Sequence, residues 1–200
     1  MKIYFYTLAL LLFSSFVFGQ NIPTQLPIYP GKSVKDEGYV ITNNNDTIFG
    51  MVELWKDDCF IKVCLTNKMA NKGTFYRADK IKKFKIGKSF YESIVLKDAH
   101  YFFRRLIDGP VSLFDQYDVQ KQNFASGNID FGSTKRTKKE YYLLKNDYLV
   151  KVPHTFFKKN MAEYFKDDEK LSKEIENNEL GFENLVAIIS EYNEWYISKK

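Results

Sequence analysis

Side chains able to act as acids, bases or nucleophiles are few in this 200-residue chain. It has two histidines, His100 and His154, and neither stands at a metal-binding distance along the sequence from Cys, Asp or Glu. Each precedes a segment expected to be regular, where a structural histidine is the commoner finding. The sequence has no glycine-rich phosphate loop, Gly-x-Ser-x-Gly elbow or Ser-x-x-Lys pair. It therefore predicts no catalytic, cofactor-binding or metal-binding residue, and no cofactor.

Carboxylates occur in two runs, Asp57-Asp58 and Asp167-Asp168-Glu169. A glycosidase uses two carboxylates on either side of a sugar, but adjacent carboxylates at turns and helix starts usually form turns or caps. A hydrolase that uses carboxylates such as Asp57 and Glu92 with His100 remains an alternative. The aromatic content of 17% could form a sugar-stacking or apolar ligand surface, although core packing is the first explanation.

The only cysteines are Cys59 and Cys64. The four residues between them read as a strand, which at about 3.3 Å per residue would separate the two Cα atoms by roughly 16 Å. A disulfide tolerates at most about 7 Å. The pair is predicted to be two free thiols, unless a tight bend between them permits a bridge.

The first residues are typical of a secretion signal. Met1-Lys2 is a short positive region, and residues 3–18 form an apolar run that is followed by Gly19. Cleavage after Gly19 would make Gln20 the new N-terminus. A membrane anchor is the competing interpretation, but a span needs roughly 20 predominantly apolar residues, and polar residues follow this run at once. We therefore expect an extracytoplasmic protein in the periplasm, at the cell surface or secreted.

Charge and hydropathy limit the partners of the mature chain. The formal charge of +5 becomes +4 when residues 1–19, with one Lys and no acidic residue, are removed. This excess is smaller than the concentrated basic face of nucleic-acid-binding proteins. No cysteine for lipid attachment follows the signal, and no second apolar stretch is long enough to span a bilayer. The expected partner is an unknown protein or envelope ligand, with no nucleic acid and no transmembrane span.

Residues 36–152 are expected to form an antiparallel β domain after an extended lead-in over residues 20–35. Short segments rich in Tyr, Phe, Ile and Val alternate there with turn signals. Two hairpins are the clearest, one around the polar turn 43–46 and one around Asn146-Asp147. Residues 118–139 are polar without a period and are predicted to form a mobile loop.

After Pro153 the apolar spacing changes from 2 to about 3.6 residues, which predicts C-terminal helices over residues 153–200, packed on the β domain. Thr155 and Asp168 stand where helix caps are expected. The last helix is the clearest because its apolar residues form one stripe. That stripe contains Phe182, Leu185, Val186, Ile189, Tyr192 and Tyr196.

Several motifs, taken in order, resemble those of a family of uncharacterised secreted proteins of the Bacteroidota. The resemblance covers most of the mature chain and departs from the family at Asn45 and after Asp118. It implies secretion and supplies no catalytic residue. The motifs are Gly38-Tyr39-Val40-Ile41-Thr42, Asp46-Thr47-Ile48-Phe49-Gly50, Asp79-Lys80-Ile81-Lys82-Lys83-Phe84, Tyr91-Glu92-Ser93, Leu106-Ile107-Asp108-Gly109-Pro110-Val111-Ser112-Leu113-Phe114 and Glu191-Tyr192-Asn193-Glu194-Trp195.

The sequence thus predicts an α+β fold, with an antiparallel meander or partly closed, barrel-like sheet followed by two to three helices. The expected function is that of an exported, non-enzymatic binding or structural module of the cell envelope. Two alternatives stay open: an extracytoplasmic carrier of a small lipid, glycan or peptide, and the hydrolase described above.

Overall fold

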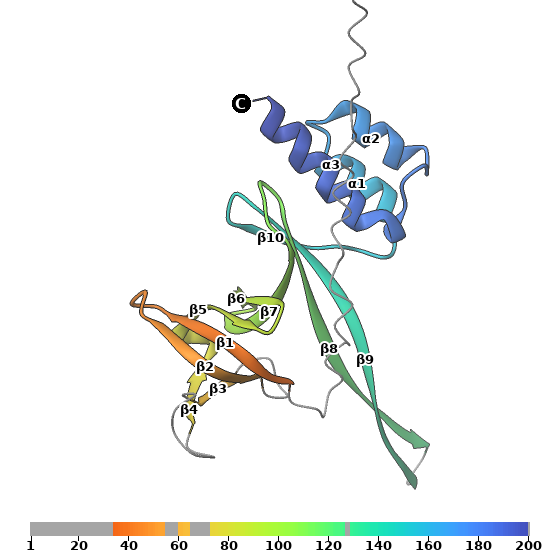
Figure 1. Cartoon of the computed structure of the whole chain (residues 1–200). Helices are drawn as coiled ribbons and strands as arrows, with labels where there is room; N and C mark the ends of the chain where they lie inside the picture. The colour runs from red at the N-terminus through yellow and green to blue at the C-terminus, as the bar shows by residue number, and fades with distance from the viewer. Residues whose placement is uncertain (1–33, 55–59, 65–72, 127–128, 200) are drawn as a thin grey trace, which may run out of the picture.

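A computed structural model describes residues 34–54, 60–64, 73–126 and 129–199 (Figure 1). They form an antiparallel sheet followed by helices, which confirms the predicted α+β fold. Cys59, Asp57 and the predicted signal lie outside the described residues. The predictions about the disulfide and about the Asp57 carboxylate therefore stay predictions. The strands are β1 (Val34–Thr42), β2 (Thr47–Leu54), β3 (Phe60–Cys64), β4 (Thr74–Arg77), β5 (Ile81–Ile86), β6 (Ser89–Leu96), β7 (Ala99–Ile107), β8 (Ser112–Ser126), β9 (Ile129–Lys145) and β10 (Tyr148–Lys151).

The ten strands follow the order β10-β9-β8-β7-β6-β5-β1-β2-β3-β4. Chain neighbours are paired at every step except one, because β5 pairs with β1 after the short 3₁₀ helix η1 (Ala78–Lys80). Strands β4 and β10 each pair on one side within the described chain, so the sheet is open and not a closed barrel. Both clearest hairpins are confirmed by the pairing of β1 with β2 and of β9 with β10.

Residues 118–139 were predicted to form a mobile loop, and this was wrong because the described residues of that segment form strands. Strands β8 and β9 are paired from Ser112–Leu144 to Ser126–Ile129, with a register shift near Asn123. Strand β7 pairs with β8 only as far as Asp115, so the outer part of the hairpin is a two-stranded ribbon that extends away from the sheet (Figure 1). A ribbon without a sheet beside it needs no apolar face, which explains why the sequence lacks the two-residue period.

Buried ion pairs hold the base of this ribbon. Asp115 is 1% exposed, and its carboxylate accepts a hydrogen bond from Arg104 Nε at 2.9 Å and lies 3.1 Å from Lys139 Nζ. On the other face, Glu140 lies 3.1 Å from Lys138 Nζ and 3.2 Å from Lys151 Nζ. A buried carboxylate is tolerated where cations surround it.

The C-terminal helices are α1 (Phe157–Tyr164), α2 (Glu169–Glu176) and α3 (Leu185–Ser198), with a 3₁₀ turn η2 (Phe182–Asn184) before α3. Asp168 caps α2 as predicted, because its carboxylate accepts a hydrogen bond from Leu171 N at 3.2 Å. Thr155 does not cap α1. The N-cap is Phe156, which has a left-handed backbone (φ 57°) and no side-chain cap. None of the helices in the described ranges is long and apolar enough to cross a membrane.

The helices pack on the β7–β10 end of the sheet through one apolar core, as expected. Leu113 and Leu143 contribute from the sheet, and the predicted stripe on α3 contributes Leu185, Ile189 and Tyr192. The remaining stripe residues, Phe182, Val186 and Tyr196, are partly buried against the same core. A second core covers one face of the β1, β2, β5, β6 and β7 strands. It contains Val40, Val52, Leu54, Ala78, Ile81, Phe84, Ile86, Tyr91 and Phe102.

Candidate functional site

Glu92 and His100, the two described members of the possible hydrolase set, do not meet. Cα pairing places Glu92 opposite Phe103 and His100 opposite Val95, so the two residues lie on opposite faces of the sheet. The Glu92 carboxylate instead lies 2.7 Å from Arg105.

His100 contacts a serine with the wrong hydrogen-bond polarity for nucleophile activation. Its Nδ1 lies 3.0 Å from Ser93 Oγ, and Ser93 Oγ donates to the carbonyl of Ala78 at 2.6 Å. Because the hydroxyl proton points to that carbonyl, the ring nitrogen acts as the donor to Ser93 in this arrangement. A serine nucleophile requires the reverse, with its proton directed to the base.

The acidic run at the start of α2 connects the helices with the sheet. Asp167 accepts a hydrogen bond from the Tyr192 hydroxyl at 2.5 Å and one from Lys145 Nζ at 3.1 Å. Partial burial opposes ionisation, but these two hydrogen bonds outweigh it and hold the pKa of Asp167 below its ordinary value. Burial, and secondarily the Asp167 charge, raises the pKa of Tyr164 to about 12. Asp167 therefore has a structural role, because it joins α3 through Tyr192 to β9 through Lys145.

His154 also has an aromatic partner, since its ring stacks on Phe182 with 3.9 Å between centroids. No group of three or more His, Cys, Asp or Glu side chains that could hold a metal ion is found within the described ranges.

A different set of side chains is brought together by the strand register. One row of Cα partners runs across eight adjacent strands, each residue directly opposite the next, and every residue in it is aromatic or basic. In order from β2 to β10 the row is Phe49, Tyr39, Lys85, Phe90, Arg105, Phe114, Tyr142 and Lys151.

The row is buried on β8 and β9, and its part on β2 to β6 lies outside the core. Phe114 is fully buried and Tyr142 is 6% exposed, whereas Phe49 is 66% exposed and Phe90 is 38% exposed. The exposed end lies on the face of β1, β2, β5 and β6 opposite the Val40–Phe84 core, at the part of the sheet away from the helices (Figure 1). We call this surface the open face and define it by Tyr39, Phe49, Lys83, Lys85 and Phe90.

The aromatic side chains of the open face contact one another and the neighbouring cations. Tyr39 and Phe49 form an edge-to-face pair with 5.9 Å between ring centroids. Lys85 Nζ lies 5.2 Å from the centroid of the Phe90 ring, and the Arg105 guanidinium carbon lies 5.8 Å from it. Both distances are within the range of a cation–π contact. The side chains of the row therefore restrict one another's positions.

The basic side chains of this region differ in how far they are neutralised. Arg105 forms ion pairs with Glu92 at 2.7 Å and with Asp108 at 3.2 Å. Within the described part of the chain, no carboxylate forms an ion pair with Lys83 or Lys85. The free positive charges of the open face are thus concentrated on β5.

The opposite side of the same strands is a tightly packed core that fixes the open face. Phe84, which follows Lys83 and precedes Lys85, stacks on Tyr91 with centroids 4.7 Å apart and an interplanar angle of 4°. It meets Phe102 edge to face, also at 4.7 Å. Because successive strand residues alternate in direction, this packing orients the two lysines outward.

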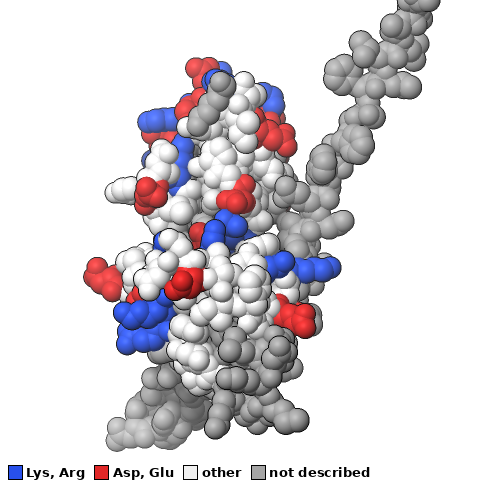
Figure 2. Space-filling view, turned by 60° about the vertical axis from the view of Figure 1, so that its left-hand side comes forward, with Lys and Arg blue, Asp and Glu red and all other residues white. Residues whose placement is uncertain are grey.

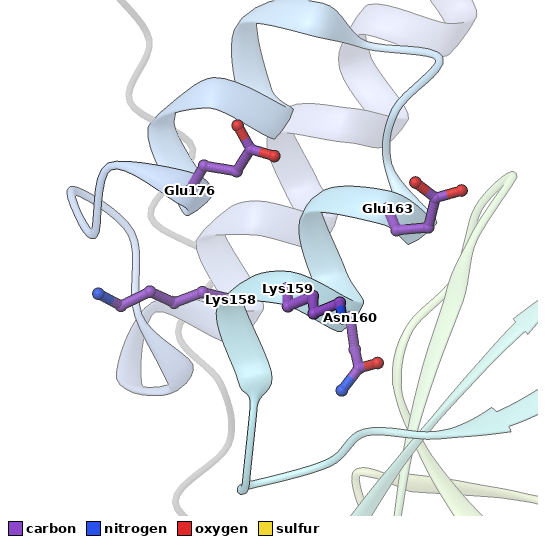
Figure 3. Close-up of a pocket in the computed structure, with 5 residues that line it drawn as sticks. All are labelled: Lys158, Lys159, Asn160, Glu163 and Glu176. Atoms are coloured by element: carbon purple, nitrogen blue, oxygen red, sulfur yellow. The ribbon is translucent and has the colours of Figure 1, made fainter.

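A separate cleft of about 610 Å³ lies on the helical part and is lined by Lys158, Lys159, Asn160, Glu163 and Glu176. Figure 3 shows these side chains on α1 and α2, with Lys158 and Asn160 extending away from Glu176. They do not converge on one point, and Glu163 is already paired with Lys166 at 2.7 Å. The cleft is a weaker candidate than the open face.

Charge is mixed over the face of the molecule seen in Figure 2. Basic and acidic side chains are scattered among uncharged residues, and no continuous basic surface is visible in that view. The sequence interpretation assigned most aromatic residues to the core and missed the row. The sequence does place Tyr39 and Phe49 on the strand faces opposite the buried Val40 and Val52. The alignment of the row across four strands, however, follows only from the pairing register of those strands.

Comparison of the chain with protein-family models, with curated proteins and with solved structures finds no match to any of them.

Proposed function

We propose that the protein is an exported, non-enzymatic binding module of the cell envelope whose ligand lies on the open face. The observation that carries this proposal is the alignment of Phe49, Tyr39, Lys85 and Phe90 on four neighbouring strands, outside the core. Single exposed apolar residues are ordinary. Here Phe49 and Phe90 are exposed and Tyr39 between them is partly buried. Neighbouring aromatic residues outside the core with a lysine among them are typical of a recognition surface.

The rigidity of the surface supports this function. The side chains lie on regular strands whose other face is the Phe84–Tyr91 core, so a ligand would meet groups already close to their bound positions. Preorganised side chains lose less conformational entropy on binding, which favours affinity. The separation of Glu92 from His100 also gives the hydrolase alternative less support than the binding module has.

The carrier alternative, in which the sheet encloses a small ligand, has less support. Its two edge strands, β4 and β10, do not pair with each other, so the sheet forms no closed wall. The face that an enclosing sheet would turn toward its ligand is occupied here by large apolar side chains such as Phe84 and Phe102. The open sheet therefore fits a ligand bound on its surface better than a ligand enclosed by its strands.

Export is part of the proposal and rests on the sequence of residues 1–19, with its positive start, apolar run and small residue at position 19. The resemblance to secreted proteins of the Bacteroidota is consistent with it. The expected partner is therefore a molecule of the envelope or the surroundings of the cell, and not nucleic acid.

The test is a binding survey of the purified protein on immobilised glycans, lipids and peptides, with matched aromatic variants. Tyr39→Ala combined with Phe49→Ala removes the exposed end of the row. Tyr148→Ala is the control, because Tyr148 is 77% exposed but belongs to β10. Circular dichroism spectra of both variants report whether the sheet is preserved.

We expect at least one class of ligand to be retained by the parent protein and the Tyr148 variant, and to be lost by the double variant. Retention that survives in a folded double variant would contradict the proposal. So would catalytic turnover of a retained molecule.

A further inference from the structure

We propose that the ligand of the open face is an acidic glycan, a chain of sugars that carries carboxylate groups. This inference rests on the proposed binding function and adds the ligand class. It combines two features of the open face that one ligand would have to match: the aromatic rings of β1, β2 and β6, and Lys83 and Lys85 on β5, which have no carboxylate partner among the described residues.

The spacing of the aromatic rings fits an extended chain of sugars. Phe49, on β2, and Phe90, on β6, are separated by two intervening strands, β1 and β5. At about 4.8 Å between neighbouring strands, their Cα atoms are roughly 14 Å apart across the sheet. The carbon–hydrogen faces of sugar rings pack on aromatic side chains, and a span of this length exceeds that of a single sugar.

The charge within that span favours an acidic ligand. Lys83 and Lys85 lie two residues apart on the same face of β5, so their Cα atoms are separated by roughly 7 Å. Neither has a carboxylate partner among the described residues, whereas the next cation along the row, Arg105, has two. The contact with Phe90 restricts Lys85, which reduces the entropy lost when its ammonium group binds an anion.

Single-stranded nucleic acid also combines flat rings with negative charge and is the main competitor. Proteins that bind it present a positively charged groove along the phosphate backbone. The surroundings of the open face are mixed instead, because Glu92 lies opposite Lys83 and the exposed Glu37 lies two residues before Tyr39 on the same face. Those two carboxylates oppose any ligand with a charge on every unit, so the choice between the two ligand classes rests on the proposed export. An exported protein rarely meets nucleic acid, and glycan is therefore favoured. Nucleic acid is an outcome of the test.

The experiment is isothermal titration calorimetry of the purified protein with three probes of similar length. These are a hexasaccharide of galacturonate, the neutral hexasaccharide cellohexaose, and a single-stranded oligothymidylate. The informative variant is Lys85→Gln, which removes one charge of the open face. Lys158→Gln is its control, because it makes the same charge change at an exposed position on α1.

The galacturonate hexasaccharide should bind, cellohexaose should bind about tenfold more weakly or not at all, and the oligothymidylate should not compete. Lys85→Gln should reduce galacturonate affinity by about tenfold, the loss expected for one charge-assisted hydrogen bond. Raising the salt from about 0.15 M to about 1 M should weaken binding because the ion pairs are exposed. Lys158→Gln should leave the affinity unchanged.

Equal binding of cellohexaose, tighter binding of the oligothymidylate, or an unchanged affinity of Lys85→Gln would overturn the acidic-glycan inference. The same holds if no probe binds. The broader proposal is judged separately: it stands if another immobilised ligand is lost in the Tyr39 and Phe49 double variant, and fails if binding persists there.

Discussion

The side-chain amide of Asn193 pairs with the backbone of Val111 as a neighbouring strand would. Asn193 Oδ1 accepts a hydrogen bond from Val111 N at 2.8 Å, and Asn193 Nδ2 donates to the Val111 carbonyl at 2.9 Å. Helix α3 is thereby joined to the turn between β7 and β8. The turn residue Gly109 leaves room for this amide, because an added Cβ would lie 2.5 Å from Nδ2.

Replacing this amide should loosen the helices from the sheet. Asn193→Ala leaves the buried backbone groups of Val111 without partners, and we expect a loss of about 2–4 kcal/mol in the free energy of unfolding. Urea denaturation measures this loss. The neighbouring exposed variant Glu194→Ala should change stability by less than about 0.5 kcal/mol. Equal stability of both variants would show that the pairing contributes nothing.

Glu140 should make stability depend on acid pH. Its burial opposes ionisation, but the ion pairs with Lys138 and Lys151 hold the pKa of Glu140 below the ordinary value of 4.5. A carboxylate whose pKa is lower in the folded than in the unfolded protein stabilises the folded state at pH values above its unfolded pKa. That contribution is lost as the pH falls below about 4.5 and through the folded pKa.

Glu140→Gln should therefore be less stable than the parent protein near neutral pH, and the difference should shrink below about pH 4. Urea denaturation at a series of pH values measures both effects. Glu194→Gln, at an exposed site on α3, is the control and should follow the parent curve. A difference that stays constant down to low pH would refute the assigned role of this carboxylate.

Gly38 should be intolerant of a side chain because β1 and β5 approach closely there. A Cβ at this position would lie 1.8 Å from the carbonyl oxygen of Lys85. Gly38→Ala should lower the free energy of unfolding by about 3 kcal/mol, at the upper end of the range for overpacking. The adjacent exposed substitution Glu37→Ala is the control. Thermal unfolding of the two variants measures the difference in stability. Equal stability of Gly38→Ala and Glu37→Ala would show that β1 and β5 can move apart to accept the side chain.

The proposed export makes a prediction about the chain itself. Protein recovered from outside the cytoplasm of a secreting host should begin at Gln20, because the small residue Gly19 follows the apolar run. N-terminal sequencing determines this directly. Recovery of exported protein that retains Met1 would contradict cleavage.

The local parts of the fold could be predicted because local chemistry determines them. Polar turns such as Asn146-Asp147, where both residues have positive φ, identified the hairpins, and apolar spacing identified α3. Asp168 was predicted as a cap because its carboxylate acts within one turn. Thr155 is not the cap, since the N-cap lies one residue later at Phe156, whose carbonyl accepts hydrogen bonds from both Asn160 N and Nδ2.

The non-local parts could not be predicted. Pairing of β5 with β1 joins segments separated by three other strands along the chain, and no periodicity encodes it. The β8–β9 ribbon was missed because polar residues on both faces resemble a loop. The open face depends on the first of these pairings, because Tyr39 and Lys85 become neighbours only through the β1–β5 register.

The most direct test of the binding account is hydroxyl-radical footprinting of the protein with and without the ligand that it retains. Phe49, Tyr148 and Phe156 are 66%, 77% and 76% exposed, so all three should be oxidised in the free protein. The account predicts that ligand protects Phe49 and leaves Tyr148 and Phe156 unchanged. Protection of Phe156, the N-cap residue of α1, with no change at Phe49 would contradict it.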